Sequence, residues 1–312
     1  MAPSADDPAP AVSEVCAPAA GRLDVALVEA GLASSRNRAA REIRAGRVQV
    51  DGRGALRAAD RVAAGARLRL EAPDPWVARS AHKLLGALAD SGLRSAPDGA
   101  VCLDAGASTG GFTQVLLSHG AAAVHAADVG HGQLVPLLAQ DHRVRDLPGT
   151  NVRELTPAQL AAPAPFHADG TVDLVVADLS FISLTLVLDG LLAVCRPGAL
   201  LGLMVKPQFE LGRSALDKHG VVADPADRVR AVLGVVRALG AAGAQPLAVS
   251  PSRLPGPAGN REVFVWARAR TGPAAATPAT TRSASVEPEP GRSFVLASDP
   301  RAAVAAAVEG RA

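Results

Sequence analysis

The chain has 312 residues, of which 48% are hydrophobic and 20% are charged, and its net charge is +2. This length is long for one domain and comfortable for two, and the apolar content predicts a globular protein with a sizeable core. The composition excludes a membrane span, because no apolar run reaches the roughly 18 uninterrupted residues that a span needs. The N-terminus lacks the basic and apolar segments of a signal peptide, so we expect no export.

The three cysteines, Cys16, Cys102 and Cys195, lie far apart and form no CxxC pair. They cannot all pair as disulfides within one chain, which favours a reducing compartment. We therefore expect a cytoplasmic protein.

The charge is distributed unevenly along the chain. Residues 21–70 contain eleven arginines and five acidic residues, a local charge of +6 that leaves −4 for the rest. Such an asymmetry predicts a small basic module attached to a near-neutral body, and nucleic acid is the usual partner of such a module.

Both ends of the chain are rich in Ala, Pro, Ser and Thr. Residues 1–20 and 271–312 show no sustained periodicity, so we predict a disordered tail at the N-terminus and a low-complexity tail at the C-terminus. One short helix is expected within the second tail, because Asp299 can cap it, Pro300 suits its first position and Gly310 can end it.

Two helices and a strand are predicted within the basic module, residues 21–70. Apolar residues recur at helical spacing from Leu23 and stop at Gly31. A second helix begins after Ser34 or Ser35, either of which can cap it, and ends at Gly46. The segment RVQVDG then alternates as a strand and runs into an Asp-Gly turn.

The outer face of the second helix is basic. It carries Arg36, Arg38, Arg41 and Arg44, which few acids offset. A solvated surface is the alternative interpretation, but helices normally mix signs, and the imbalance favours a contact with nucleic acid.

The module resembles the small RNA-binding domain first seen in ribosomal protein S-four, whose helices and strand match "SR…RAAREIRAGRVQVDG". The resemblance implies that Arg36, Arg38, Arg41, Arg44 and Arg47 contact RNA phosphates. Contacts of this kind position a protein and make its affinity salt-dependent, but they specify little sequence.

Residues 71–80, with two prolines and Trp76, predict an interdomain linker. Beyond it, residues 81–270 alternate between apolar strands and Ala/Leu-rich helices. The expected strands are Val101–Asp104, Ala123–Asp128, a short one near Arg143–Asp146, Val172–Asp178, Ala199–Lys206, Ala244–Val249 and Glu262–Ala267. The expected helices include Phe112–His119, Leu184–Cys195 and Asp227–Leu239. This alternation predicts an α/β fold with a mostly parallel, doubly wound sheet.

The segment VCLDAGASTGGFT places a Gly-rich turn between a strand that ends at Asp104 and a helix. Such a turn lets backbone N–H groups approach a ligand at a helix N-terminus. A dinucleotide fingerprint needs Gly where this chain has Ser108, so NAD is disfavoured. Asp128 ends the next strand about 20 residues further on, where a carboxylate can hold ribose hydroxyls. These residues predict an adenosine-bearing ligand, best S-adenosyl-L-methionine (SAM), with a purely structural turn as the alternative.

Four separated polar residues form a second candidate set: Lys83 in AHKLLGAL, Asp178 in VVADLSFIS, Lys206 in MVKPQFE and Glu262 in PGPAGNREVF. Ligands bind at the carboxyl ends of the strands of an open parallel sheet, so Asp178 and Lys206 should face the same crevice as the Gly-rich turn. Each residue alone also has a structural interpretation, as a surface lysine, a cap or an ordinary first residue of a strand.

Five motifs, LDAGASTGGFT, AADVG, VVADLSFIS, VKPQFE and LPGPAGN, occur in the order found in the TlyA family of haemolysin-like rRNA 2′-O-methyltransferases. The resemblance covers about residues 21–270. It implies a Rossmann-like class I SAM-dependent methyltransferase fold of the FtsJ-like type, with a seven-stranded, mostly parallel sheet. A small α+β RNA-binding domain precedes it in that family. The resemblance further implies cytidine in the rRNA of ribosomal subunits as substrate, a monomer, and no metal.

The Lys-Asp-Lys-Glu tetrad of that family maps onto Lys83, Asp178, Lys206 and Glu262. The resemblance assigns contacts with SAM to Asp104, Gly106, Ser108, Thr109, Gly110, Gly111, Phe112, Asp128, Val129 and Asn151. The chain departs from the family pattern at Ser80-Ala81, where paired glycines are usual, and at His131, where an aromatic residue is common. Neither departure removes a tetrad member.

Methyl transfer from a sulfonium to a 2′-OH needs an oriented, partly deprotonated hydroxyl. A lysine can serve as the base only if its pKa falls from about 10.4 toward about 7 or 8, through desolvation and nearby positive charge. We expect Lys206 to be the base, with the sulfonium and Lys83 supplying that charge. Asp178 would orient Lys206, and Lys83 and Glu262 would position the ribose. Holding the reactants in line supplies much of the acceleration.

Three other functions are weighed against this one. RNA pseudouridine synthases also carry the N-terminal module, but they lack a Gly-rich cofactor loop. A pore-forming cytolysin, suggested by the historical family name, would require an export signal and a membrane-inserting segment. An RNA-binding adaptor with an inactive methyltransferase fold is disfavoured because all four tetrad residues are present.

Overall fold

The computed structural model describes residues 13–33, 35–55, 57–71, 75–256, 258–270, 294–296 and 299–310. The chain forms two compact units, one that ends at Pro75 and one that starts at Trp76. In the part of the chain that the structure describes, no helix combines the length and the apolar character needed to cross a membrane.

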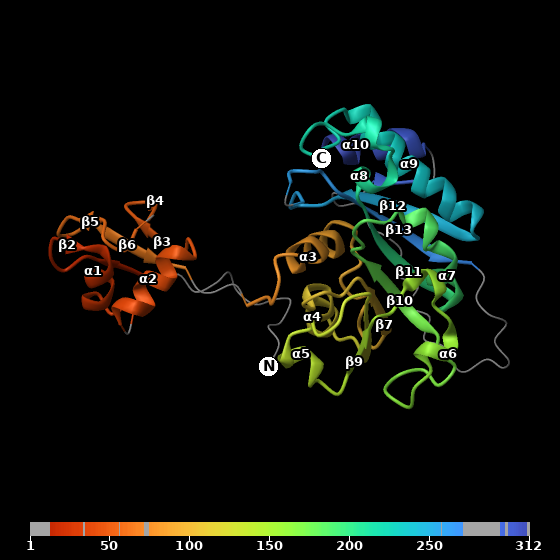
Figure 1. The fold of residues 1–312 in the computed structure, drawn as a ribbon, viewed down its shortest axis with the longest axis horizontal. Helices are drawn as coiled ribbons and strands as arrows, with labels where there is room; N and C mark the ends of the chain where they lie inside the picture. The colour runs from red at the N-terminus through yellow and green to blue at the C-terminus, as the bar shows by residue number, and fades with distance from the viewer. Residues whose placement is uncertain are drawn as a thin grey trace. The chain divides into compact units, whose positions relative to one another are not determined.

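The N-terminal unit is a small α+β domain (Figure 1). Its elements are β1 (Ser13–Cys16), β2 (Gly21–Arg22), α1 (Leu23–Glu29), α2 (Arg36–Arg44), β3 (Val48–Val50), β4 (Arg53–Gly54), β5 (Arg61–Val62) and β6 (Arg67–Leu70). Four strands form a sheet in the order β1-β6-β3-β4, and β2 pairs with β5. Buried apolar residues of α1 and α2, with Leu27 and Ile43 among them, pack with Leu68 of β6 into one core.

Local chemistry explains the helix start and the hairpin of this unit. The hydroxyl of Ser35 accepts a hydrogen bond from the Arg38 N–H at 3.2 Å and caps α2, as expected for one of two serines. The other, Ser34, lies outside the described residues. Asp51 and Gly52 both have positive φ, 49° and 78°, which is the geometry of the tight turn that joins β3 to β4.

The N-terminal tail differs from expectation where the structure describes it. Residues Ser13–Cys16 form β1, which pairs antiparallel with β6 from Ser13↔Leu70 to Cys16↔Arg67. All four side chains of β1 are exposed, so backbone hydrogen bonds along a sheet edge hold the strand. A segment that buries no side chain leaves no hydrophobic pattern to find in the sequence.

The second unit is built on an eight-stranded sheet in the order β14-β12-β13-β11-β10-β7-β8-β9. Its strands are β7 (Val101–Ala105), β8 (Ala123–Asp128), β9 (Val144–Pro148), β10 (Val172–Ala177), β11 (Cys195–Val205), β12 (Ala244–Pro251), β13 (Val263–Ala269) and β14 (Phe294–Val295). Strands β7 to β11 are mutually parallel, and β13 runs antiparallel between β11 and β12. The seven predicted strands are confirmed, and β14 adds a short eighth strand at the edge.

Helices cover both faces of this sheet (Figure 1). They are α3 (Ala81–Asp90), α4 (Gly111–Ser118), α5 (Pro136–Ala139), α6 (Pro157–Leu160), α7 (Leu188–Ala193), α8 (Pro207–Glu210), α9 (Pro225–Ala241) and α10 (Pro300–Glu309). Apolar residues of α3 and α4 form one core with one face of the sheet, and those of α7, α9 and α10 form another with the opposite face. The expected helix over Leu184–Cys195 is shorter, because it opens as a 3₁₀ turn and Cys195 already belongs to β11.

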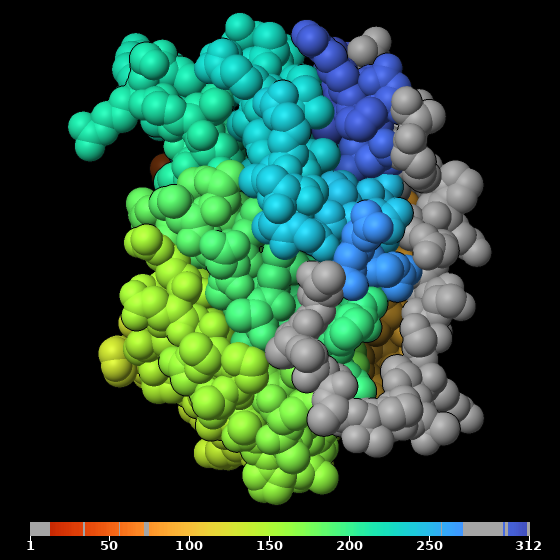
Figure 2. Space-filling view, turned by 90° about the vertical axis from the view of Figure 1, so that its right-hand side faces the viewer, coloured from red at the N-terminus to blue at the C-terminus, as the bar shows by residue number. Residues whose placement is uncertain are grey.

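The C-terminal tail is corrected by the structure in its described part. The helix expected after Asp299 is confirmed as α10, where the Asp299 carboxylate accepts hydrogen bonds from two backbone N–H groups and Gly310 ends the helix with φ 68°. It packs against α9 and β12, and Figure 2 shows α9 and α10 side by side on this face. Buried Val304 and Val308 make it part of the core. The capping residues indicated the helix but not the surface that it covers.

The expected linker over residues 71–80 also ends sooner than predicted. Trp76 and Val77 pack against the core on the α3 and α4 face, and the Val77 N–H donates to the Gln114 side chain at 2.8 Å. Residues 76–80 therefore belong to the second unit and lead directly into α3.

Candidate active site

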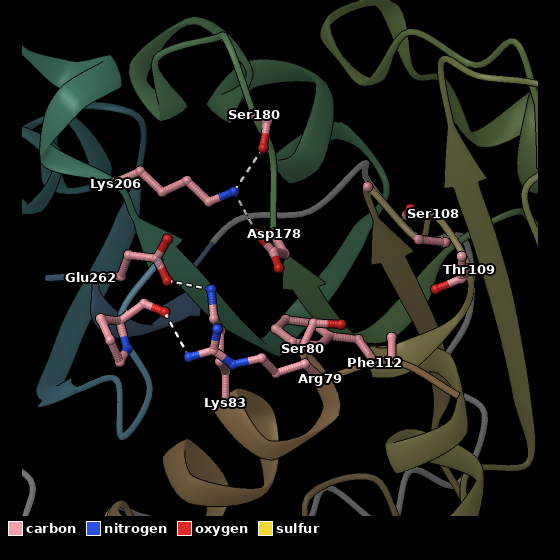
Figure 3. Close-up of a pocket in the computed structure, with 14 residues that line it drawn as sticks. Arg79, Ser80, Lys83, Ser108, Thr109, Phe112, Asp178, Ser180, Lys206 and Glu262 are labelled. Atoms are coloured by element: carbon pink, nitrogen blue, oxygen red, sulfur yellow. Dashed lines mark hydrogen bonds and ion pairs between the residues drawn. The ribbon is translucent and has the colours of Figure 1, made fainter. Parts of the chain in front are cut away.

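Two lysine–carboxylate pairs face one cavity of about 320 Å³ in the second unit (Figure 3). The Lys206 Nζ lies 2.7 Å from Asp178 Oδ1, and the Lys83 Nζ lies 2.5 Å from Glu262 Oε2. The structure thus brings together all four members of the predicted tetrad. It lines the cavity with Gly106, Ser108, Thr109 and Phe112 of the predicted cofactor set, and with Ala78, Arg79, Ser80, Ala107, Ser180 and Pro255.

The sheet topology explains why these distant residues meet. Asp178 and Lys206 directly follow β10 and β11, so they lie at the carboxyl edge of the parallel strands. Glu262 precedes β13, whose antiparallel direction puts its first residue at the same edge, where Val263 pairs with Val205. Lys83 lies in the first turn of α3. Strand order reverses between β7 and β10, the place where open α/β sheets bind ligands.

The two lysines are held differently. Lys83 and Glu262 are 7% and 3% exposed, and they form a buried, hydrogen-bonded ion pair. Lys206 is 8% exposed and donates a hydrogen bond to Ser180 Oγ at 2.8 Å. Its contact with Asp178 is an ion pair without hydrogen-bond alignment, since Asp178 Oδ1 accepts no hydrogen bond from a described residue. Lys206 is therefore held by two residues, Asp178 and Ser180.

Glycines in the loop between β7 and α4 allow the cavity to form. Gly106 has φ +88°, and a Cβ there would lie 2.8 Å from the backbone oxygen of Asp178. Gly110 has φ +101°, and a Cβ would overlap Leu138. A Cβ at Gly111 would meet the Ser80 hydroxyl, so Ser80 occupies the space beside the loop. Side chains at these positions would push the loop away from the carboxyl edge.

Asp128 organises the outer part of this loop. Its Oδ2 accepts a hydrogen bond from the Ser108 N–H at 2.9 Å, and its Oδ1 accepts from the Gly130 N–H at 2.8 Å and from the Gln133 amide at 3.2 Å. A carboxylate offers about four acceptor positions, so one remains for a further donor. The Gln133 contact is long, and a ligand hydroxyl can replace it.

Asp104 is fully buried beneath the loop. Thr113 Oγ1 donates to its Oδ2 at 2.7 Å, whereas its Oδ1 has no hydrogen-bond partner among the described residues. Burial raises the pKa of the Asp104 carboxyl to about 7, and the negative charges of Asp178 and Asp128 act in the same direction. The Thr113 hydrogen bond opposes this rise. A buried carboxyl beside two carboxylates, with one oxygen that has no described partner, favours the arrival of positive charge.

Six members of the predicted cofactor set lie outside the cavity lining: Asp104, Gly110, Gly111, Asp128, Val129 and Asn151. Val129 follows Asp128 and is 70% exposed. Asn151 is exposed and caps a 3₁₀ turn by accepting from the Arg153 N–H at 3.2 Å, next to Thr150, whose N–H donates to the Asp128 backbone oxygen. Both residues border Asp128, so a ligand that reaches Asp128 passes near them.

Phe181 follows the lining residue Ser180 and was not singled out by the sequence reasoning. It is 92% exposed and has φ 66°, a conformation that bulky side chains rarely adopt. Its ring lies 5.3 Å from the ring of Phe209, centroid to centroid, and Phe209 in turn lies 5.9 Å from Lys206 Nζ. An aromatic residue in the short loop after Asp178 was the available signal.

Comparisons with known proteins identify the family. Residues 76–269 match the model of the FtsJ-like methyltransferases, and residues 21–68 match the S4 domain. The chain is 48% identical over 252 residues to the 16S/23S rRNA (cytidine-2′-O)-methyltransferase TlyA of Mycobacterium tuberculosis (strain H37Rv), covering 80% of this chain and 90% of that protein. The chain belongs to the TlyA family of FtsJ-like methyltransferases.

Other relatives of this TlyA-family methyltransferase carry different names. Hemolysin A of Brachyspira hyodysenteriae is 33% identical over 203 residues, covering 65% of this chain and 81% of that protein. The solved structure of a protein described as a "putative hemolysin" from Streptococcus thermophilus is 29% identical, with a TM-score of 0.64 over 94% of this chain and 98% of that one. The two-unit architecture is thus shared with a solved structure.

The basic face of the N-terminal unit differs in part from expectation. Asp24 and Glu42 are buried and pair with arginines of the predicted RNA-binding set. Asp24 Oδ2 accepts from Arg36 at 3.0 Å, and a hydrogen bond from Arg22 lowers the pKa of Asp24 to about 2. Glu42 pairs with Arg38 and Arg47. Acids therefore offset three of the five predicted arginines, against the expectation of an unbalanced face.

Arg41 and Arg44 complete that set. Both are exposed on α2, and neither forms an ion pair with any residue that the structure describes. They are the two members of the set whose guanidinium groups are available to a phosphate without breaking a contact within the domain.

Proposed function

We propose that this TlyA-family methyltransferase transfers a methyl group from SAM to the 2′-hydroxyl of a cytidine in ribosomal RNA. The observation that carries the proposal is the convergence of the Lys206–Asp178 and Lys83–Glu262 pairs on one cavity beside the Gly-rich loop. The substrate class follows the name of the M. tuberculosis relative and the presence of an S4 domain. In this proposal the protein acts as a monomer, as the sequence resemblance implies.

The residues beside the loop fit SAM. Gly106 leaves room for a close approach to the backbone, and Asp128 has an acceptor position left for a ribose hydroxyl. The unpaired Oδ1 of Asp104 lies beneath the loop, where a cationic ligand would be favoured. When bound, SAM supplies an electrophilic methyl group.

The tetrad residues take separate roles around the 2′-oxygen. Lys206 Nζ accepts the proton of the 2′-OH as the O–methyl bond forms and the sulfur–methyl bond breaks. Asp178 and Ser180 hold the amine toward the cavity. Lys83, anchored by Glu262, donates to the ribose and fixes its orientation. Fixed geometry of this kind converts an encounter of two reactants into a step within one complex.

Methyl transfer to isolated ribosomal subunits tests this function. The purified protein is incubated with small or large subunits and with SAM labelled in its methyl group, and the RNA is then mapped by alkaline cleavage. A 2′-O-methyl group blocks cleavage at its own nucleotide, so we expect a new protected cytidine that requires SAM. Label on a base, or tight SAM binding with no label in either subunit, would contradict the proposal.

The affinity for SAM should depend on pH through Asp104. Positive charge near this carboxyl favours its ionised form, and its pKa is about 7 in the free protein. SAM binding therefore releases a proton below that pH, and the affinity should rise with pH by up to about ten-fold per unit, then level off above about pH 7. Isothermal titration at a series of pH values measures this dependence.

The matched control is Asp104→Asn, which keeps an acceptor for Thr113 and removes the titration. Its SAM affinity should vary little over the same pH range. S-adenosylhomocysteine, which lacks the sulfonium charge, should show a shallower dependence than SAM with the wild-type protein. A wild-type SAM affinity that does not vary with pH would show that the ionisation of Asp104 is not coupled to SAM binding.

RNA binding by the S4 domain should rest on Arg41 and Arg44. Replacing both with Ala should reduce the slope of log affinity against log salt by roughly 1.4 to 1.8, since each phosphate contact contributes about 0.7 to 0.9. The melting temperature should not change, because neither side chain pairs with a described residue. Filter binding to rRNA fragments at several salt concentrations gives the slope.

Arg47→Ala provides the contrast. It removes a partner of buried Glu42 and should lower the free energy of unfolding by about 1–3 kcal/mol. If the Arg41/Arg44 variant keeps the wild-type salt slope, another surface of the protein supplies the phosphate contacts.

A further inference from the structure

One face of α3 contacts the segment that follows β12 and carries Glu262, described over residues 252–256 and 258–262. Lys83, Gly86 and Asp90 are spaced at i, i+3 and i+7, so they lie on the same side of the helix. Each of the three contacts this segment. At its first turn α3 supplies a cation to Glu262, and at its last turn it supplies an anion to Arg253.

The Arg253 contact is a two-point clamp. Its Nη2 lies 2.5 Å from Asp90 Oδ1, and its Nε donates to Asp90 Oδ2 at 3.1 Å. Asp90 is buried, whereas Arg253 is about half exposed. Two parallel hydrogen bonds between a guanidinium and a carboxylate fix direction as well as distance.

Gly86 makes the approach of Arg253 possible. A Cβ at position 86 would lie 2.7 Å from the Cδ of Arg253 and 2.9 Å from its Cγ. The side chain of Arg253 therefore crosses α3 in the space left by the missing methyl group. A larger residue at this position would displace the arginine from Asp90.

The rest of the segment is tied down beyond the clamp. Arg79 donates to the Pro255 backbone oxygen at 3.4 Å, and the Gly256 N–H donates to the Asn260 backbone oxygen at 2.9 Å. The buried Asn260 side chain bonds to the backbone at Gly220 and Val222. The Ser252 N–H, next to Arg253 in the chain, donates to the backbone oxygen of Glu262 at 2.9 Å, so a shift at Arg253 reaches Glu262 through this bond.

We propose that Arg253 is a positioning residue. Its contacts with Asp90, made across Gly86, hold Glu262 in contact with Lys83. The two contacts join the same pair of elements, and the Lys83–Glu262 pair forms one side of the cavity. The Gly-rich loop forms the other side, as Figure 3 shows for Ser108 and Thr109. Loss of the clamp therefore loosens the ribose side and leaves the cofactor side in place. The expected change in methyl-transfer rate rests on the proposed function. The expected loosening of the Lys83–Glu262 contact does not.

Amine labelling tests the structural consequence without any assay of activity. The chain has three lysines, Lys83, Lys206 and Lys218, and of these Lys218 is exposed. We compare the acylation rates of Lys83 and Lys218 by mass spectrometry in the full-length wild type, Arg253→Gln and Gly86→Ala. In both variants Lys83 should react about five-fold faster relative to Lys218, because local opening exposes it. A ratio within about two-fold of wild type in both variants overturns the proposal.

Kinetics test the consequence for the reaction. Arg253→Gln should lower kcat for methyl transfer by about 10- to 100-fold while the Kd for SAM stays within about two-fold, and Arg253→Lys should recover part of the loss. The control Arg230→Gln removes an exposed ion pair with Asp227 on α9 and should leave kcat unchanged. A parallel loss of SAM affinity and melting temperature, with kcat unchanged for the bound enzyme, would indicate a merely structural role and overturn the proposal.

A double-mutant cycle separates positioning from general stability. If Arg253 acts through Glu262, then Glu262→Gln should reduce kcat at least about three-fold less in the Arg253→Gln background than in the wild type. Additive effects would count against the proposal. A wild-type protein inactive on every ribosomal subunit would refute the proposed function alone, and the labelling result would still decide the role of Arg253.

Discussion

Replacing Lys206 with Ala is expected to lower kcat for methyl transfer by about 10²- to 10⁴-fold, the range found when a positioned proton acceptor is removed. Lys206 lies between Asp178 and Ser180 at the cavity, and no other described lysine shares those two partners. The Kd for SAM should change little, because the cofactor loop does not contact the Lys206 amine in the structure. Single-turnover transfer of a labelled methyl group, with SAM titration alongside, measures both quantities.

Lys218→Ala is the matched control, since it removes an exposed lysine outside the cavity lining. A base must be unprotonated to accept a proton, so the single-turnover rate of the wild type should rise with pH and then level off. A rate that falls as pH rises would assign Lys206 a role as a proton donor or a fixed charge. Transfer by Lys206→Ala at nearly the wild-type rate would remove it from the mechanism.

Replacing Phe181 with Ala is expected to lower kcat/KM for rRNA by about 5- to 150-fold, corresponding to the 1–3 kcal/mol of one base stacked on an aromatic ring. An exposed phenylalanine in a left-handed conformation, beside Phe209 and the Lys206 pair, is suited to stack on a base that has left its helix. Affinity for SAM should not change. Kinetics at subsaturating rRNA report kcat/KM directly.

Two variants separate stacking from strain at this position. Phe181→Gly removes the ring and relieves the positive φ, so the protein should be at least as stable as the wild type and still lose kcat/KM. Leu186→Ala removes an exposed apolar side chain of a neighbouring 3₁₀ turn and should have little effect. If Phe181→Gly keeps the wild-type kcat/KM, the ring does not contact RNA.

The second unit could be predicted well from sequence because its strands are buried on both faces and read as apolar runs. Strands β7, β8, β10 and β11 were expected within a few residues of where they lie. The sequence did not predict the elements whose formation or position depends on backbone pairing or on tertiary packing. Strands β1 and β14 are short edge strands, and the docking of α10 depends on a surface of α9 that is distant in sequence.

The site could be predicted as a set of residues but not as a set of contacts. Parallel strands end at the same edge of a sheet, so the sequence places Asp178 and Lys206 together. Nothing in the sequence spacing shows that Lys83 contacts Glu262, which is 179 residues away. On α2 the four-residue spacing of Arg38 and Glu42 permits their ion pair, but the expectation of an unbalanced basic face overlooked it. The ion pair between Asp24 of α1 and Arg36 of α2 requires the packing of α1 on α2.

The position of β13 ties completion of the site to the last steps of assembly. In chain order β13 follows β12, yet in the sheet it lies between β12 and β11. During synthesis, β12 therefore cannot join the parallel strands until β13 has paired with β11. The pairing of β13 also brings Glu262 into contact with Lys83. A nascent chain that still lacks this strand holds the cofactor loop, Asp178 and Lys206 but has no partner for Lys83. The Lys83–Glu262 pair thus forms once β13 has joined the sheet, before the later elements β14 and α10 are added.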